Sequence, residues 1–164
     1  MRIIVLLFAF SFSSCVSVTY VVRHAEKQSG ALDPALTPEG EVRAQALAQL
    51  LSTRDIKEIY STDYTRTRLT AKPSADMLDL EIKIYGSDTL QSFVDHQLLT
   101  LGKNRLVVGH SNTILPIVQC FGLTPTVQQI PDDDYDNLFI VRRSRFLWGI
   151  KIKLEEMTYG EASP

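Results

Sequence analysis

The chain has 164 residues, the length of one domain, and its 45% hydrophobic and 22% charged residues exclude a disordered or fibrous protein. Its 17 basic and 19 acidic side chains give a formal charge of −2, which provides no general basic footprint for nucleic acid. Two cysteines, Cys15 and Cys120, are too few for a disulfide-stapled fold or a cysteine-rich zinc module.

The N-terminal segment differs in composition from the rest of the chain. Arg2 supplies a positive charge, residues 3–12 are apolar apart from one serine, and small residues precede Cys15. A charged start, a short apolar run and small residues describe an export signal, and the run is far shorter than the ~20 residues of a spanning helix. We expect residues 1–14 to be a signal peptide cleaved before Cys15; a buried first strand is the alternative.

Cys15 resembles the lipidated cysteine of bacterial lipoproteins. Residues 15–164 would then form the remaining domain, exported to the periplasmic side or cell surface and held on a membrane by the N-terminal lipid anchor.

Beyond Cys15, strand and helix patterns alternate. Strands are expected over 16–22, 56–60, 82–85 and 106–108, and a final strand pair over 137–142 and 146–154. Helices are expected over 38–52, capped by Thr37, from about 63 with a break or kink at Pro73, over 90–101, and from the strand over 106–108 through Cys120. A loop over 25–36 and a frayed tail from Gly160 complete the chain. The apolar face expected for the helix over 38–52 comprises Val42, Ala46, Leu47, Leu50 and Leu51. This alternation predicts an α/β fold, a three-layer α/β/α sandwich around a mainly parallel sheet.

Basic and imidazole side chains follow several of these strands. His24 comes after Arg23 at the end of the first strand, His110 follows the strand over 106–108, and Arg66 lies shortly after the strand over 56–60. Ligands of open α/β sheets bind beyond the carboxyl ends of the strands. Guanidinium groups match the oxygens of a phosphoryl group in shape and charge, so we expect an anion site at this edge.

Four segments, in order, resemble motifs of the histidine phosphatase superfamily, which has a phosphoglycerate-mutase-like fold. They are Val22-Arg23-His24-Ala25-Glu26, Leu36-Thr37-Pro38-Glu39-Gly40, Ser61-Thr62-Asp63-Tyr64-Thr65-Arg66 with Thr70-Ala71, and Val107-Val108-Gly109-His110-Ser111-Asn112. Two features depart from the family pattern: Ala25 stands where Gly is frequent, and the Glu-containing insertion that carries the general acid of mutases is missing.

The resemblance implies a phosphatase that needs no metal and no cofactor and acts on a phosphorylated small molecule or phosphoprotein. His24 would accept the phosphoryl group as a phosphohistidine that water hydrolyses. Arg23, Arg66 and His110 would bind the phosphoryl oxygens. The alternative is an exported or membrane-anchored module that binds a phosphate ligand without turnover.

The general acid is predicted with an alternative. Asp88 follows the strand over 82–85 and is the first candidate, but with Gln91 it also matches a helix N-cap and its capping partner. Glu26 is the second candidate, and its carboxylate is also expected to pair with Lys27 or Arg23.

Other functions fit the sequence less well. Residues 109–113 come near the nucleophile elbow of esterases, but no histidine follows Ser111. His24 and His110 lack the clustered ligands of a zinc site, and the aspartates of residues 132–136 lack the glycine of a calcium loop, which favours a solvated loop. His96 and Arg68 are expected at the surface.

Overall fold

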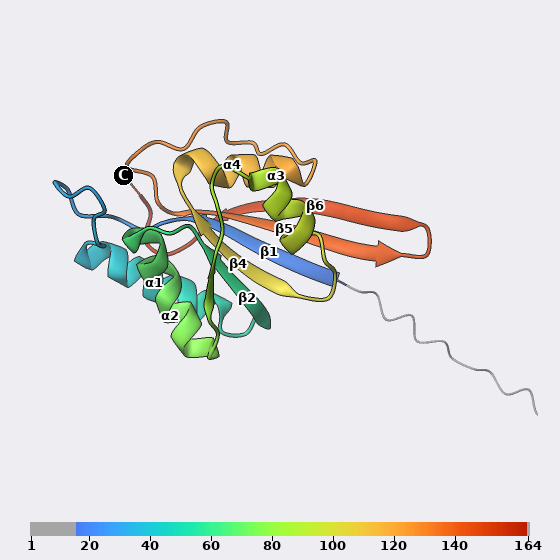
Figure 1. Ribbon diagram of the computed structural model, residues 1–164, viewed down its shortest axis with the longest axis horizontal. Helices are drawn as coiled ribbons and strands as arrows, with labels where there is room; N and C mark the ends of the chain where they lie inside the picture. The colour runs from blue at the N-terminus through green and yellow to red at the C-terminus, as the bar shows by residue number, and fades with distance from the viewer. Residues whose placement is uncertain (1–15, 164) are drawn as a thin grey trace, which may run out of the picture.

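The structure, a computed structural model, describes residues 16–163, which contain one six-stranded sheet (Figure 1). Its strands are β1 (Val16–Arg23), β2 (Ile56–Ser61), β3 (Ile82–Ile84), β4 (Asn104–Gly109), β5 (Asn137–Phe146) and β6 (Gly149–Thr158). They lie in the order β3-β2-β4-β1-β5-β6, parallel from β3 to β1, with β5 antiparallel to both β1 and β6. The mainly parallel sheet is confirmed, whereas the predicted signal peptide and Cys15 lie outside the described residues.

Helices cover both faces of the sheet. On one face lie α1 (Pro38–Leu51) and α2 (Thr65–Leu78), and on the other α3 (Leu90–Phe93), the π-helical turn η1 (Val94–Leu98) and α4 (Ser111–Cys120) (Figure 1). The central strands are therefore buried on both sides: Val21 and Val107 pack in the core under α4, and Val22 and Val108 in the core under α1 and α2. This confirms the three-layer sandwich. None of the helices between residues 16 and 163 is long and apolar enough to cross a membrane.

The buried face of α1 differs from the predicted one. Val42 is 63% exposed, while Ala44, Leu47, Ala48 and Leu51 are buried. These four positions follow the i, i+3, i+4, i+7 spacing of one helix face, and a face centred on them turns Val42 toward solvent.

The helix α2 continues through Pro73 to Leu78, so of the predicted break or kink at this proline the break is wrong. A proline inside a helix removes one backbone hydrogen bond and costs about 3 kcal/mol. Ala71 and Ala75, one helical turn apart on either side of Pro73, are buried in the core against the sheet, and this packing stabilises the helix across the proline.

The C-terminal tail is attached to the domain, contrary to the predicted fraying. The Arg43 Nη1 donates to the carbonyl oxygens of Tyr159 at 2.9 Å and Glu161 at 2.8 Å. The Ser163 amide donates to Asp136 Oδ2 at 2.8 Å. Two side chains from distant parts of the chain thus fix residues 159–163.

Glu58 on β2 is the centre of a cluster of ion pairs. Its carboxylate accepts hydrogen bonds at 2.9 Å from Lys83 Nζ, Lys103 Nζ and the Nε of the fully buried Arg105. Burial acts to raise the pKa of Glu58, but the hydrogen bonds from Lys103, Lys83 and Arg105 outweigh it and lower the pKa to about 2.

We expect Glu58→Gln to lower the free energy of unfolding by about 3 kcal/mol near neutral pH, because it leaves buried Arg105 without a counter-ion. Since the pKa of folded Glu58 lies below its ordinary 4.5, the carboxylate stabilises the fold above that pH, and this contribution is lost as the pH falls toward 2. Urea unfolding at several pH values measures both effects. Glu155→Gln, which removes an exposed carboxylate 3.4 Å from Arg142, is the control, and an equal loss in both variants would contradict this account.

Candidate functional site

His24 lies at the carboxyl end of β1 and is only 3% exposed. Its amide donates to the Gly109 carbonyl at the end of β4 at 2.8 Å, which ties the ends of the two central strands together. The ring Nδ1 lies 2.8 Å from the Ala25 carbonyl oxygen. Because a carbonyl only accepts, Nδ1 carries the proton of the neutral ring, and Nε2 keeps its lone pair.

Burial lowers the pKa of His24 to about 3, and the neighbouring charges of Arg23, His110 and Arg66 add to this effect against the opposing hydrogen bond to Ala25. The imidazole is therefore neutral across the ordinary pH range, as a nucleophile or a base requires.

His110 follows β4 and precedes α4, with its ring centroid 5.4 Å from that of His24. Its Nε2 lies 2.9 Å from Thr62 Oγ1, and its Nδ1 lies 3.5 Å from an Arg66 Nη2. Burial, followed by the positive charges of Arg66 and Arg23, lowers the pKa of His110 to about 4, although Asp33 acts to raise it.

Two buried threonines orient the His110 ring, and the sequence analysis missed both. The Thr67 hydroxyl has two carbonyl acceptors for its proton, those of Thr62 and Tyr64, each at 2.9 Å. The Thr67 oxygen in turn accepts a hydrogen bond from the Thr62 hydroxyl at 3.1 Å. Since the Thr62 hydroxyl proton goes to Thr67, the Thr62 oxygen accepts from His110 Nε2–H. This leaves His110 Nδ1 unprotonated and directed toward Arg66. The only sign of these roles in the sequence is that residues 62–70 contain four threonines.

In Thr62→Val we expect His110 no longer to be fixed in the tautomer with its proton on Nε2, because valine has the shape of threonine but no acceptor for this N–H. Ring-nitrogen NMR shifts of His110 should move from one defined tautomer to a mixture, and the fold should lose about 1 kcal/mol of stability. Thr62→Ser keeps the hydroxyl and should preserve the wild-type shifts. Unchanged His110 shifts in Thr62→Val would refute the orienting role.

Arg66 occupies the first turn of α2, beside His110. Its Nη1 lies 3.5 Å from Asp33 Oδ1, and its guanidinium stacks over the Tyr64 ring at 4.5 Å. Asp33 also accepts from the Thr65 amide and hydroxyl, at 3.0 and 2.7 Å, which joins the loop after β1 to the start of α2. The buried Arg66 Nε has no partner within residues 16–163. Arg66 is thus held at the site with one donor free.

Arg23 also lies at the site, but the segment after α4 binds its side chain. The Nη1 donates to the carbonyls of Pro131 at 2.6 Å and Asp134 at 2.9 Å, and Nη2 lies 3.6 Å from Asp132 Oδ1. The guanidinium stacks on Tyr135, whose ring centroid lies 5.9 Å from that of His24. Asp132 and Asp133 are exposed, as predicted for a solvated loop, but the segment 131–135 also contacts Arg23 and His24.

Two glycines and the Thr70 hydroxyl hold the segments that follow β1 and β4 close to their neighbours. A Cβ at Gly109 would lie 2.6 Å from Thr113 Oγ1, and one at Gly40 would lie 2.2 Å from the Glu26 carbonyl oxygen. Thr70 Oγ1 accepts from the amide of Ala25 at 2.9 Å, which anchors the loop after His24 to α2. The small residues of the four motifs thus serve close backbone packing around His24 and His110.

The two acid candidates have different surroundings. Asp88 is exposed between β3 and α3, and within the described chain no hydrogen bond or ion pair joins it to His24 or His110. The predicted cap is wrong, because the N-cap of α3 is Thr89 and Gln91 instead donates to Asp95.

The carboxylate of Glu26 accepts from Arg43, with Nε and Nη2 at 2.9 and 2.7 Å from Oε1. The predicted pairing of Glu26 with Lys27 or Arg23 is therefore wrong. As predicted, His96 and Arg68 are exposed; Arg68 pairs with Asp63 at 2.5 Å.

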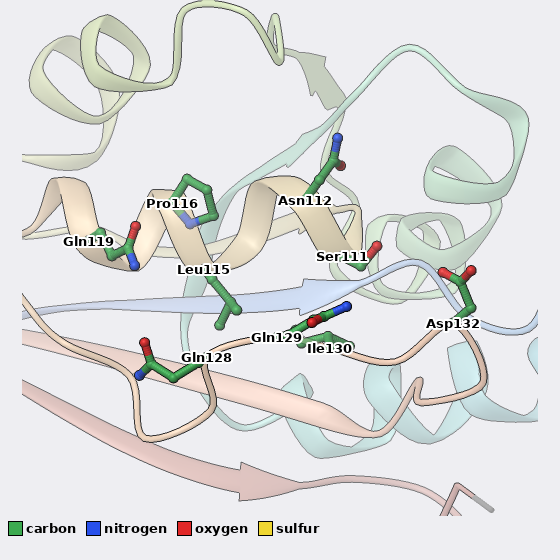
Figure 2. A pocket seen from close by; sticks show the side chains of 9 residues that line it. All are labelled: Ser111, Asn112, Leu115, Pro116, Gln119, Gln128, Gln129, Ile130 and Asp132. Atoms are coloured by element: carbon green, nitrogen blue, oxygen red, sulfur yellow. The ribbon is translucent and has the colours of Figure 1, made fainter.

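A pocket of about 490 Å³ begins one residue beyond His110. Figure 2 shows Ser111 and Asp132 at the end of the pocket near the end of β1, and Gln119 and Gln128 at the other end. Asn112 and Gln129 add two further amides, and none of the lining residues that the structure describes is basic. The pocket thus offers neutral hydrogen-bonding groups and one carboxylate beside the cationic centre.

Between residues 16 and 163, no three His, Cys, Asp or Glu side chains are grouped so as to hold a metal ion. The positive charge of the centre comes from arginine side chains. Such a centre is suited to bind an anion and to present the neutral His24 Nε2 to it.

A comparison with known proteins finds a family match in sequence. Residues 19–90 match the sequence model of the Histidine phosphatase superfamily (branch 1). Phosphoserine phosphatase 1 from Hydrogenobacter thermophilus is 41% identical over 69 residues, which cover 38% of this chain and 33% of that protein. The chain therefore spans about a third of the length of this curated relative.

Solved structures share the fold at low sequence identity. Mycobacterial hydrolase 2 superposes with a TM-score of 0.65 at 13% identity, over 92% of this chain and 93% of that chain. A putative phosphohistidine phosphatase from Nakamurella multipartitia has a TM-score of 0.60 at 17% identity, over 90% and 96% of the two chains. Residues 19–90 thus resemble the histidine phosphatase superfamily in sequence, and the described chain shares the three-layer fold of these solved structures.

Proposed function

We propose that the protein is a phosphatase that hydrolyses phosphomonoesters or phosphohistidine through a phosphohistidine on His24. The observation that carries this proposal is a neutral His24 Nε2 beside His110 and Arg66. The Nε2 lone pair attacks phosphorus, the bond from phosphorus to the leaving group breaks, and the leaving atom takes a proton. Water then attacks the phosphohistidine, the N–P bond breaks, and inorganic phosphate leaves.

Positive side chains stabilise the charge on the transferred phosphoryl group. Arg66 offers its free Nε, and Arg23 adds a guanidinium whose Nε also has no partner in the described chain. His110 directs Nδ1 toward Arg66. A bound phosphoryl dianion favours the protonated form of His110, which then donates from Nδ1 to an oxygen.

Asp88 remains the proposed general acid, on the strength of its place after β3. An alkyl phosphate needs a proton on the leaving oxygen, whereas an aryl phosphate leaves as a stable phenolate. Asp88→Asn should therefore reduce alkyl-phosphate turnover much more than aryl-phosphate turnover. An equal effect on both substrates would remove Asp88 from this role.

The pocket beside the centre suggests the chemistry of the leaving group. Four amides and a carboxylate favour a leaving group that is uncharged and rich in hydroxyls, or that carries an ammonium group. The names of the relatives give phosphoserine and phosphohistidine as compounds to test first.

A phosphomonoester panel, assayed with wild type and His24→Ala side by side, tests the function. We expect turnover that chelators leave unchanged and that vanadate inhibits, together with acid-labile phosphate trapped on the wild-type protein in a single turnover. Phosphate binding without trapping or turnover would instead identify the protein as a phosphate-ligand-binding module. Activity that EDTA abolishes and a divalent ion restores would overturn the mechanism.

We further propose that residues 1–14 are an export signal and that Cys15 is lipidated, from the composition of this segment. The protein would then fractionate with membranes on the periplasmic side or cell surface, and Cys15→Ser would not incorporate a fatty-acid label. A cytosolic product that retains Met1 would reject this proposal.

A further inference from the structure

The hairpin of β5 and β6 ends in an apolar tip, residues 146–150, whose large side chains are all exposed. Phe146, Leu147, Trp148 and Ile150 are 53%, 70%, 94% and 50% exposed. Figure 1 shows the hairpin extending beyond the neighbouring strands. The side chains of the tip therefore do not serve the core.

The residues of the turn are unusual for a tight hairpin. Leu147 and Trp148 connect the paired residues Phe146 and Gly149. Two-residue turns favour Asn, Asp and Gly, because these residues tolerate the backbone that the turn requires. Large apolar side chains at this position add nothing to the turn itself, which indicates a role in binding.

Basic side chains surround the tip. Residues 138–154 contain five basic and no acidic side chains, namely Arg142, Arg143, Arg145, Lys151 and Lys153. Arg145, Lys151 and Lys153 are exposed, and none of these three forms an ion pair within the described residues. An apolar tip in a basic collar matches the acyl boundary and anionic headgroups of a membrane surface.

The tip lies at the end of the sheet opposite the candidate site. Val16 pairs with Ser144, so the chain enters β1 beside the tip, and β1 then runs to Arg23 and His24. At ~3.3 Å per residue, this strand places roughly 23 Å between the tip end and the site.

We propose that the hairpin tip docks on an anionic lipid surface, with Leu147 and Trp148 in the interface and Arg145, Lys151 and Lys153 at the headgroups. A second copy of the chain is a poorer occupant, because a two-fold contact would bring two identical basic collars together. The proposal depends neither on the phosphatase activity nor on lipidation of Cys15. A domain docked through this tip would present the candidate site away from the bilayer, toward substrates dissolved in water.

The experiment uses the one tryptophan of the sequence, Trp148, as the probe. The full chain carrying Cys15→Ser is mixed with phosphatidylcholine vesicles that contain or lack phosphatidylglycerol. We expect Trp148 emission to shift to the blue and to be quenched by lipids brominated on the acyl chain. At about 1 kcal/mol for each of three basic residues, anionic vesicles should bind roughly a hundredfold tighter than neutral ones.

Paired variants separate the tip from the rest of the chain. Leu147→Asp should abolish the shift and the quenching, whereas Val42→Asp, at an exposed apolar position on α1, should leave both unchanged. Trp148 emission that vesicles do not alter would overturn the proposal. So would a dimer in light scattering that Leu147→Asp dissociates, because the tip would then bind a second copy.

Discussion

Alanine in place of His24 should reduce turnover of every phosphomonoester to background, by at least about a thousandfold, because the proposed mechanism has no other group to replace this nucleophile. His96→Ala is the matched control. His96 is exposed, and among residues 16–163 its ring forms hydrogen bonds only with Ser92, one helical turn away. We expect it to keep wild-type rates, and initial rates on an aryl phosphate measure both variants.

The pH dependence provides a second measurement on the same variant. The pKa of His24 is lowered from 6.5 to about 3, so the unfolded chain takes up its proton at a higher pH than the folded one. This histidine therefore contributes stability above 6.5, and the contribution is lost as the pH falls toward 3. His24→Ala should lose less stability than wild type over that interval. Retained turnover in His24→Ala would assign the nucleophile to another residue.

The sequence was sufficient to predict where the strands before His24 and His110 end, but the predicted turn between residues 142 and 146 is wrong, because the hairpin turns at Leu147 and Trp148. Runs of β-branched residues stop at His24 and at His110, and parallel strands bring their carboxyl ends to one edge of the sheet. Thr37 as the cap of α1 was predictable for the same reason, since its bond to the Gly40 amide spans three residues. Local patterns define such features without knowledge of the packing.

The side-chain partners of the site were not predictable in this way. The carbonyls that bind Arg23 lie 108 and 111 residues further along the chain, and Arg43, the partner of Glu26, lies 17 residues away. Any of several opposite charges matches Glu26 in the sequence, and packing alone selects Arg43. Thr62 was missed for a similar reason, because a threonine acquires its orienting role only when His110 lies against it.

Arg66→Lys should lower kcat by roughly a hundredfold to a thousandfold, the usual cost of removing one donor to a developing negative charge. Lysine keeps the charge but not the planar set of donors, one of which faces His110 and the others of which would bind the phosphoryl oxygens in the proposed mechanism. The structure predicts a smaller change in KM, because Arg23 still attracts the substrate. Steady-state kinetics on one aryl phosphate separates the two constants.

Arg68→Lys is the control for this measurement, because Arg68 lies two residues further along the same helix. Its guanidinium pairs with the exposed Asp63, and its side chain is 47% exposed. Exposed pairs contribute at most about 1 kcal/mol to stability, so we expect Arg68→Lys to leave kcat and KM unchanged. An equal loss of kcat in the two variants would show that the arginines of α2 act only through their charge, without a specific contact at the site. A loss of kcat confined to Arg66→Lys would instead show that catalysis needs a guanidinium beside His110, where the Arg66 Nη2 lies.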